Sequence, residues 1–306
     1  MKPKVSVCMI TYNHEKYIAQ AIESVLIQKT DFDYELVIGE DFSTDKTREI
    51  VIKYQKKYPN KIKLILNKEN LGMMPNFIQT LKACKGEYIA LLEGDDYWTD
   101  PHKLQKQVDF LENNIDFVLC FHNARTLNQK TGDYSKLFFY GKQKKVWELD
   151  DLLRNNFIPT LTCVFKNHLF DKFPRWYYHA FPGDWPLHII NARYGKIGYI
   201  DKIMATYRHH DKGVVTGSNP IHNYQRYIKT FIAIKSYVSP ILKPIADETI
   251  ARFYFELSWL YYKENNINKA YNSFIKCLKL KPFNHTISKK RLLILVGKLF
   301  FNKIIS

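Results

Sequence analysis

An apolar run near the amino terminus, Val5-Ser-Val-Cys-Met-Ile10, is followed directly by Thr11-Tyr12-Asn13. A short apolar run that ends in polar residues is typical of a buried strand. Apolar residues then recur at the i, i+3, i+4, i+7 and i+8 spacing of one helix face, at Ile18, Ala21, Ile22, Val25 and Leu26. The chain is therefore expected to open with a strand and a helix.

The alternation of strand and helix continues through the first half of the chain. A further helix should begin at Asp100-Pro101, since aspartate caps free amides and proline suits the first turn. Residues 131–147 read as a loop, and the sheet should end near Tyr207. Alternating strands and helices predict a mostly parallel sheet with helices on both faces. The other predicted strands cover 34–39, 62–66, 87–92, 117–121 and 160–165, and the other predicted helices include 44–58 and 75–83.

Composition indicates a globular protein. The chain has 306 residues, of which 46% are hydrophobic and 25% charged, and this excludes disordered and collagen-like classes. Its five cysteines are widely spaced, so we interpret them as small apolar residues in a reducing compartment. We see no secretory signal and no apolar stretch of roughly 18 residues that could span a membrane. A cytoplasmic protein is expected.

The net charge of +16 is concentrated toward the carboxyl terminus. Residues 221–306 hold 15 Lys or Arg and 4 Asp or Glu, and their pattern is helical. We therefore expect a domain over 1–220 and a basic helical extension over 221–306. Within that extension, a tetratricopeptide-like hairpin is predicted over about 251–282. The residues that match its spacing are Tyr254, Leu257, Tyr261, Ala270, Phe274 and Pro282.

The last segment, 288–306, alternates basic residues with leucine, isoleucine and phenylalanine. A basic amphipathic helix of this kind can lie in the plane of an anionic membrane. Alternatively, the helix docks on the preceding hairpin and keeps its lysines in water. Both interpretations stay open at the level of the sequence.

Polar residues follow three of the predicted strands, at Thr11-Tyr12-Asn13, Glu40-Asp41-Phe42-Ser43 and Glu93-Gly94-Asp95-Asp96. In open parallel sheets, ligands bind outside the carboxyl ends of the strands. The sequence has no glycine-rich dinucleotide motif and no Walker loop, so a phosphate-bearing ligand would need a cation. Adjacent aspartates suit Mg²⁺ or Mn²⁺. The simpler alternative is a solvated turn.

Together, Val5-Ser-Val-Cys-Met-Ile-Thr-Tyr-Asn13, Glu40-Asp-Phe-Ser-Thr-Asp45, Asn70-Leu-Gly72 and Glu93-Gly-Asp-Asp-Tyr-Trp98 with Asp100-Pro101 resemble an inverting family-2 glycosyltransferase. The resemblance covers roughly residues 1–215 and implies an α/β GT-A fold. It also implies metal-dependent transfer of a hexose from a nucleotide sugar, with UDP as the expected nucleotide. The expected acceptor is a glycan or lipid-linked saccharide of cell-surface polysaccharide biosynthesis, at the inner face of the membrane.

The resemblance also assigns roles to individual residues. Asp41 would accept from the uracil imide, Asp95 would meet the ribose or a metal-bound water, and Asp96 would ligate Mn²⁺ or Mg²⁺. The chain departs from the family pattern at Glu40, where aspartate is more usual, and at Phe42, where glycine is usual. The full set implied for nucleotide binding is Thr11, Tyr12, Asn13, Glu40, Asp41 and Asp95.

Two later segments match the family as well. Gly183-Asp184-Trp185 implies that Asp184 is the catalytic base. Trp185, beside this proposed base, could stack on a sugar ring of the acceptor, and core packing is the alternative. Asp184 could equally cap the helix that follows, and the two roles are compatible. Tyr207-Arg-His-His210 implies Arg208 as a diphosphate contact and His210 as a further metal ligand or phosphate donor.

Rival functions explain fewer of these features. A nucleic-acid-binding protein would use the basic tail but would leave the acidic strand ends unexplained, so no nucleic acid is expected. A helical-repeat adaptor would use the tail alone, beside an inactive nucleotide-binding domain. A sugar nucleotidyltransferase would need a basic glycine-rich loop near the amino terminus, and the sequence has none.

Overall fold

The computed structural model describes residues 2–139, 143–211, 213, 217–282, 284 and 286–305. The chain forms two compact units. The first comprises residues 1–149, 157–178 and 183–211, and the second comprises 150–156, 179–182 and 212–306.

In the described part of the first unit, ten strands form one sheet in the order β3-β2-β1-β4-β9-β6-β10-β5, with β7 beside β6 and β8 beside β10. Short 3-10 turns occur in this unit at Thr160–Thr162 (η1), Arg175–His179 and Ala192–Tyr194. The strands are β1 (Val5–Thr11), β2 (Tyr34–Glu40), β3 (Ile62–Leu66), β4 (Tyr88–Glu93), β5 (Tyr97–Trp98), β6 (Phe117–Asn128), β7 (Tyr134–Leu137), β8 (Val146–Trp147), β9 (Val164–Lys166) and β10 (Lys196–His209).

Strand direction determines which chain segments meet. β1 runs parallel to β2 and β4. β9 is antiparallel to both β4 and β6, so β6 runs in the direction of β4 again, and β10 runs parallel to β6. The carboxyl ends of β1, β2, β4 and β10 therefore lie along the same edge of the sheet.

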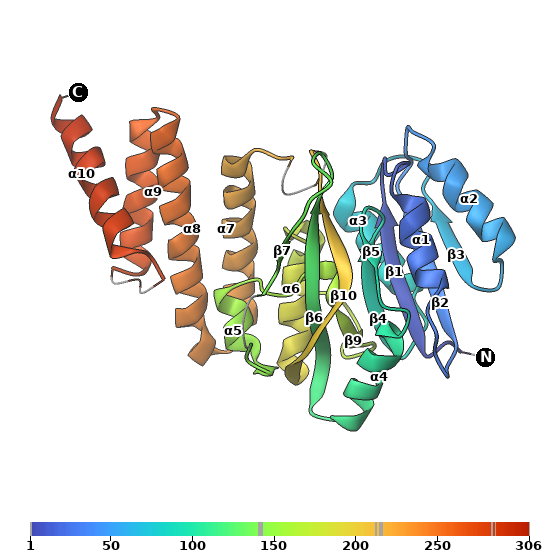
Figure 1. The fold of residues 1–306 in the computed structure, drawn as a ribbon. Coiled ribbons are helices and arrows are strands. Elements are labelled where there is room, and N and C mark those ends of the chain that lie inside the picture. Colours follow the sequence, from blue (N-terminus) through green and yellow to red (C-terminus); the bar gives the residue numbers. More distant parts are fainter. Residues whose placement is uncertain are drawn as a thin grey trace. The chain divides into compact units, whose positions relative to one another are not determined.

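Helices cover both faces of this sheet (Figure 1). On one face, α1 (Ile18–Leu26), α2 (Thr47–Lys57) and α4 (Lys103–Asn113) share a core with alternate side chains of the strands. On the other face, α3 (Met73–Ala83) packs on β1 and β2, and α6 (Asp184–Asn191) packs on β6. The predicted fold class, an α/β sheet flanked by helices and followed by a helical region, is confirmed.

Three local predictions were wrong. Helix α4 begins at Lys103, because Asp100 Oδ1 accepts from His102 N at 2.8 Å and closes a turn before the helix. The strand predicted over 160–165 is shorter, since η1 occupies its first residues. The region predicted as a loop contains β7 and β8, edge strands of four and two residues that are too short to give the apolar run of a buried strand.

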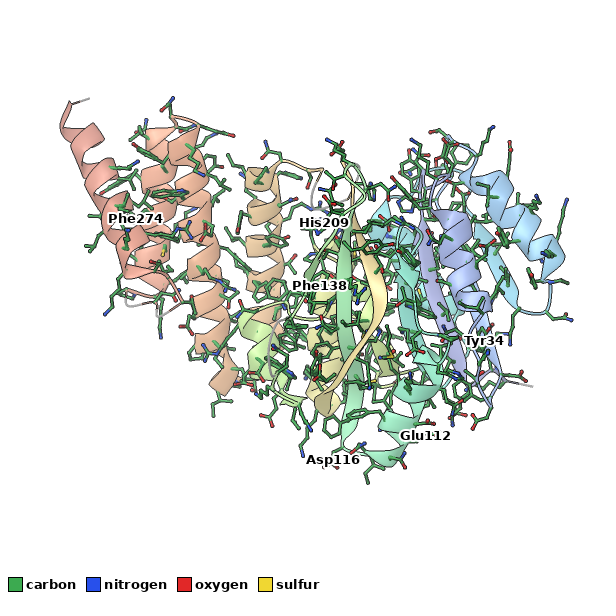
Figure 2. The ribbon with its side chains drawn as sticks, in the orientation of Figure 1. Tyr34, Glu112, Asp116, Phe138, His209 and Phe274 are labelled. Atoms are coloured by element: carbon green, nitrogen blue, oxygen red, sulfur yellow. The ribbon has the colours of Figure 1, made fainter. Side chains whose placement is uncertain are left out.

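The second unit is helical. Its segments are α5 (Leu149–Arg154, with residue 149 in the first unit), α7 (Pro220–Tyr237), the 3-10 turn Pro240–Leu242, α8 (Lys243–Lys263), α9 (Ile267–Leu280) and α10 (Lys289–Ile305). Helices α8 and α9 form a hairpin across a short loop, and Ser258 Oγ in α8 donates to the Ala270 carbonyl in α9 at 2.6 Å. Figure 2 labels Phe274, which is buried in this hairpin.

Two predictions from the sequence concern the cysteines and the membrane-spanning helices. Cys8, Cys84, Cys120, Cys163 and Cys277 are free and buried, as expected for thiols used as small apolar residues. None of the helices that the structure describes is long and apolar enough to cross a bilayer.

Candidate active site

Three carboxylates gather where β4 ends. Ligand oxygens of Glu93, Asp95 and Asp96 lie within 4.8 Å of one another. Gly94 permits this tight turn, because a Cβ there would lie 2.6 Å from Thr11 Oγ1 and 2.9 Å from His14 Nδ1. The turn therefore packs closely against the end of β1, and the three acidic side chains lie close together.

Asp96 is almost fully buried, with 1% of its surface exposed. Its Oδ1 accepts from the backbone N–H of Arg208 at 2.8 Å, whereas Oδ2 has no hydrogen-bond partner among the described residues. Burial, followed by the charges of Asp95 and Glu93, raises the pKa of Asp96 well above its usual value. A buried, unpartnered carboxylate oxygen beside two other acids fits a divalent cation, which takes oxygen ligands.

Asp95 faces two histidines. Its Oδ2 lies 2.9 Å from His210 Nε2 and 3.6 Å from His14 Nε2. Burial alone would raise the pKa of Asp95, but His14 and His210 outweigh burial and lower it. His210 follows β10, so the strand order explains how a residue 115 positions away reaches Asp95. Figure 2 labels the preceding His209 where β10 ends.

The Arg208 guanidinium has no hydrogen bond to these acids among the described residues, although its charge acts on the pKa of Asp96. The guanidinium lies 4.6 Å from the ring centre of Tyr97 and 5.1 Å from that of Tyr17. It donates to Gln129 Oε1 at 3.0 Å and to Gln20 Oε1. Arg208 is therefore a buried cation held by neutral groups, while its backbone fixes Asp96.

At the end of β2, the Asp41 carboxylate is buried and accepts three hydrogen bonds. Oδ1 accepts from Asn67 Nδ2 at 2.8 Å and Leu71 N at 2.9 Å, and Oδ2 accepts from Gly72 N at 2.9 Å. The Asn70-Leu-Gly72 motif is thus joined to Asp41. Carboxylate oxygens have two lone pairs each, so Oδ2 retains acceptor capacity for a ligand.

The loops after β1 and β2 are tied together. Asn13 Oδ1 accepts from Thr44 N at 2.8 Å, and Asn13 N donates to Ser43 Oγ at 3.0 Å. Asn13 and Phe42 both have positive φ, at 55° and 58°, which explains why glycine suits the position of Phe42. Glu40 is buried and forms an ion pair with Arg48, so it anchors this loop.

Side chains beside this loop pair are available to a ligand. Tyr12 is 41% exposed and Phe42 is 44% exposed. Thr11, by contrast, is buried, and its Oγ1 lies 3.2 Å from His14 Nδ1. The aromatic side chains thus offer surface at the sheet edge, whereas Thr11 helps to position His14.

Asp184 is the first residue of α6 and is partly exposed. Its Oδ1 accepts from Trp185 N at 2.7 Å, and its Oδ2 accepts from Thr160 Oγ1 at 2.8 Å. Burial and the charges of Asp95 and Asp184 raise the pKa of Glu93, so these acids influence one another. Trp185 is 5% exposed, which leaves little of its ring for contact with a sugar.

The structure adds residues that the sequence analysis missed. His14 lies against Asp95, Gln20 and Gln129 hold Arg208, and Thr160 holds Asp184. His14 directly follows the Thr11-Tyr12-Asn13 motif, which is a signal in the sequence. The other three belong to segments that only the tertiary fold brings to the site.

Comparison with known proteins identifies the family. Residues 6–174 match the family model described as glycosyl transferase family 2. The chain belongs to this family. An uncharacterised protein of Mycobacterium tuberculosis is 37% identical over 214 residues, which is 69% of this chain and 60% of that protein. The Escherichia coli protein WfgD, named UDP-Glc:α-D-GlcNAc-diphosphoundecaprenol β-1,3-glucosyltransferase, is 34% identical over 55% of this chain and 62% of its own.

Solved structures support the same fold. S. aureus TarS in complex with UDP-GlcNAc superposes with a TM-score of 0.67 at 21% identity, over 98% of this chain and 89% of that chain. The mannosyltransferase PcManGT of Pyrobaculum calidifontis, in complex with GDP-Man and Mn²⁺, gives 0.59 at 17% identity, over 97% and 79%. The chain spans about 60% of the length of the mycobacterial relative.

Proposed function

We propose that this protein is an inverting glycosyltransferase that transfers a hexose from a UDP-sugar to a glycan or lipid-linked saccharide of the cell surface. The observation that carries the proposal is the cluster of Glu93, Asp95 and Asp96 in a family-2 domain, with the charge of Asp184 acting on Glu93. The name of WfgD supports a UDP-sugar donor and a lipid-linked saccharide acceptor, and the UDP-GlcNAc bound to TarS supports a UDP-sugar donor. Tyr12, Asn13 and Asp41 would then contact the nucleotide, whereas the buried Thr11, predicted as a contact, would support the site by positioning His14.

A divalent cation suits the acidic cluster. Asp96 Oδ2 would ligate it, with Asp95 and His210 beside it, and the Mn²⁺ in PcManGT supports this choice of ion. When bound, the ion would neutralise the diphosphate and so make it a better leaving group. Arg208 would act by fixing Asp96 through its backbone N–H.

Asp184 would serve as the general base. In a single displacement, the acceptor oxygen forms a bond to the anomeric carbon as the bond to the diphosphate breaks, and the leaving group takes the electron pair. The acceptor hydroxyl gives its proton to the Asp184 carboxylate. Partial exposure and fixed orientation of that carboxylate support the role.

Replacement of Asp184 tests this assignment. Asp184→Asn should lower kcat about 10²-fold to 10⁴-fold, because the amide cannot accept the proton. The affinity for UDP should change less than twofold. UDP release from UDP-glucose and UDP-N-acetylglucosamine with Mn²⁺ measures the first quantity, and calorimetry measures the second. Asp116→Asn, an exposed aspartate that pairs with Lys196, is the matched control, and full turnover by Asp184→Asn would refute the assignment.

The second unit would bring the enzyme to its acceptor. We infer that α10 lies on the anionic inner face of the membrane, while the α8–α9 hairpin, with the tetratricopeptide-like spacing, supports α10. Leu295 and Leu299 are buried, whereas Lys289, Lys290 and Leu293 are exposed. One face of α10 thus packs on protein, and the other presents basic and apolar side chains together.

A further inference from the structure

Among the described residues, one hydroxyl from outside α6 forms a hydrogen bond with the proposed base. Thr160 Oγ1 donates to Asp184 Oδ2 at 2.8 Å, across 24 positions of sequence. The other oxygen, Oδ1, accepts from the backbone of Trp185 at 2.7 Å. With one lone pair of each oxygen engaged, the plane of the carboxylate is fixed, and the remaining lone pairs are free to accept a proton.

The turn that carries Thr160 is itself anchored in the core. Trp98 Nε1 donates to the Leu161 carbonyl at 2.9 Å, and Gln107 Nε2 donates to the Thr162 carbonyl at 2.9 Å. Thr162 Oγ1 bonds back to the Pro159 carbonyl at 2.7 Å. Leu161 and Thr162 are fully buried, whereas Thr160 is partly exposed. The turn therefore holds Thr160 in a defined place at the site.

We infer that Thr160 is a positioning residue that orients the Asp184 carboxylate toward the acceptor hydroxyl. This inference rests on the proposed role of Asp184 as base. Thr160 donates its own hydrogen to Oδ2, so it does not take the acceptor proton; that proton passes to the carboxylate. Loss of the hydroxyl frees the carboxylate to rotate, and a small misplacement of a reacting group costs a large factor in rate.

A purely structural role makes a different prediction. If the hydrogen bond only stabilises the fold, its removal lowers the unfolding temperature but leaves kcat unchanged. If Thr160 positions the base, kcat falls while the donor KM is preserved, because the hydroxyl acts on the carboxylate that receives the acceptor proton. A serine in its place should restore the rate, since serine keeps the donor group.

The test compares Thr160→Val and Thr160→Ser with wild type in UDP release from UDP-glucose and UDP-N-acetylglucosamine with Mn²⁺. Thr160→Val should lower kcat about 10-fold to 100-fold with the donor KM within about twofold. Thr160→Ser should stay within about threefold of wild type. Thr30→Val is the matched control, because Thr30 is also half-buried and its hydroxyl donates to the Phe32 carbonyl at 2.7 Å, its one side-chain hydrogen bond among the described residues.

Each outcome decides a separate point. The inference is overturned if Thr160→Val has the wild-type kcat or if Thr160→Ser is as slow as Thr160→Val. If Asp184→Asn has lost its activity in the same assay, the proposed function is still supported. Turnover by Asp184→Asn at the wild-type rate, or no UDP release by wild type, overturns the proposed function and the inference with it. UDP titration of Thr160→Val shows whether the variant is folded. If it is not folded, Thr160→Ala is assayed instead. Its kcat should fall by the same factor as expected for Thr160→Val, and a wild-type kcat for Thr160→Ala would overturn the inference.

Discussion

Lys103 is a lysine buried in the interior of the first unit. None of its surface is exposed, and its Nζ lies 4.0 Å from the ring centre of Trp98. Among the described residues this ammonium has no hydrogen-bond partner, and burial lowers the pKa of Lys103 to about 7. In the unfolded chain the pKa is ordinary, about 10.4. Burial of Lys103 therefore lowers the unfolding free energy by its full amount below pH 7, and this loss becomes smaller as the pH rises toward 10.

Lys103→Met should consequently stabilise the protein at pH 7 but not at pH 10. The expected gain at pH 7 is a few kcal/mol, on the order of the 1.36 kcal/mol that corresponds to each pKa unit. Urea unfolding of wild type and variant at both pH values measures the two differences. A difference in unfolding free energy that is the same at pH 7 and pH 10 would contradict this account of Lys103.

At the scale of elements, hydrogen bonds of Asn13 connect the loop after β1 to the loop after β2. Asn13 also has positive φ, which asparagine tolerates and alanine does not. Asn13→Ala should therefore be less stable than Asn13→Gly by about 1 kcal/mol, although both lose the bond to Thr44. Both variants should bind UDP more weakly than wild type. Equal unfolding free energies for the two variants would show that backbone conformation is not the cause.

The sequence predicts elements where the signal is local. The runs that become β1, β2 and β4 are apolar and end in polar residues, so the Asp95–Asp96 turn could be assigned to the sheet edge. The same reasoning missed β7, an edge strand of four residues, and misplaced the start of α4. It also missed the contact of Thr160 with Asp184. The two residues are 24 positions apart and belong to separate elements, η1 and α6, so no local pattern links them.

At the scale of the whole molecule, most of the net positive charge belongs to the carboxyl-terminal residues 221–306, which hold 15 Lys or Arg and 4 Asp or Glu. Lys289→Glu with Lys290→Glu should reduce binding to phosphatidylcholine vesicles that contain phosphatidylglycerol by about tenfold or more, since each lysine near such a surface contributes about 1 kcal/mol. Co-sedimentation measures this. The control is Lys56→Glu with Lys57→Glu, an equally exposed pair on α2. If both double variants lose vesicle binding equally, or if neither loses it, α10 is not the element that binds the membrane.

The proposed catalysis depends on the buried Asp96 Oδ2, which has no hydrogen-bond partner among the described residues, acting on the diphosphate through a cation. Calorimetric titration of UDP into wild type and Asp96→Ala, with and without Mn²⁺, tests this most directly. We predict that Mn²⁺ tightens UDP binding at least about tenfold in wild type, which corresponds to about 1.4 kcal/mol, and not at all in Asp96→Ala. An undiminished effect of Mn²⁺ in Asp96→Ala would contradict the account.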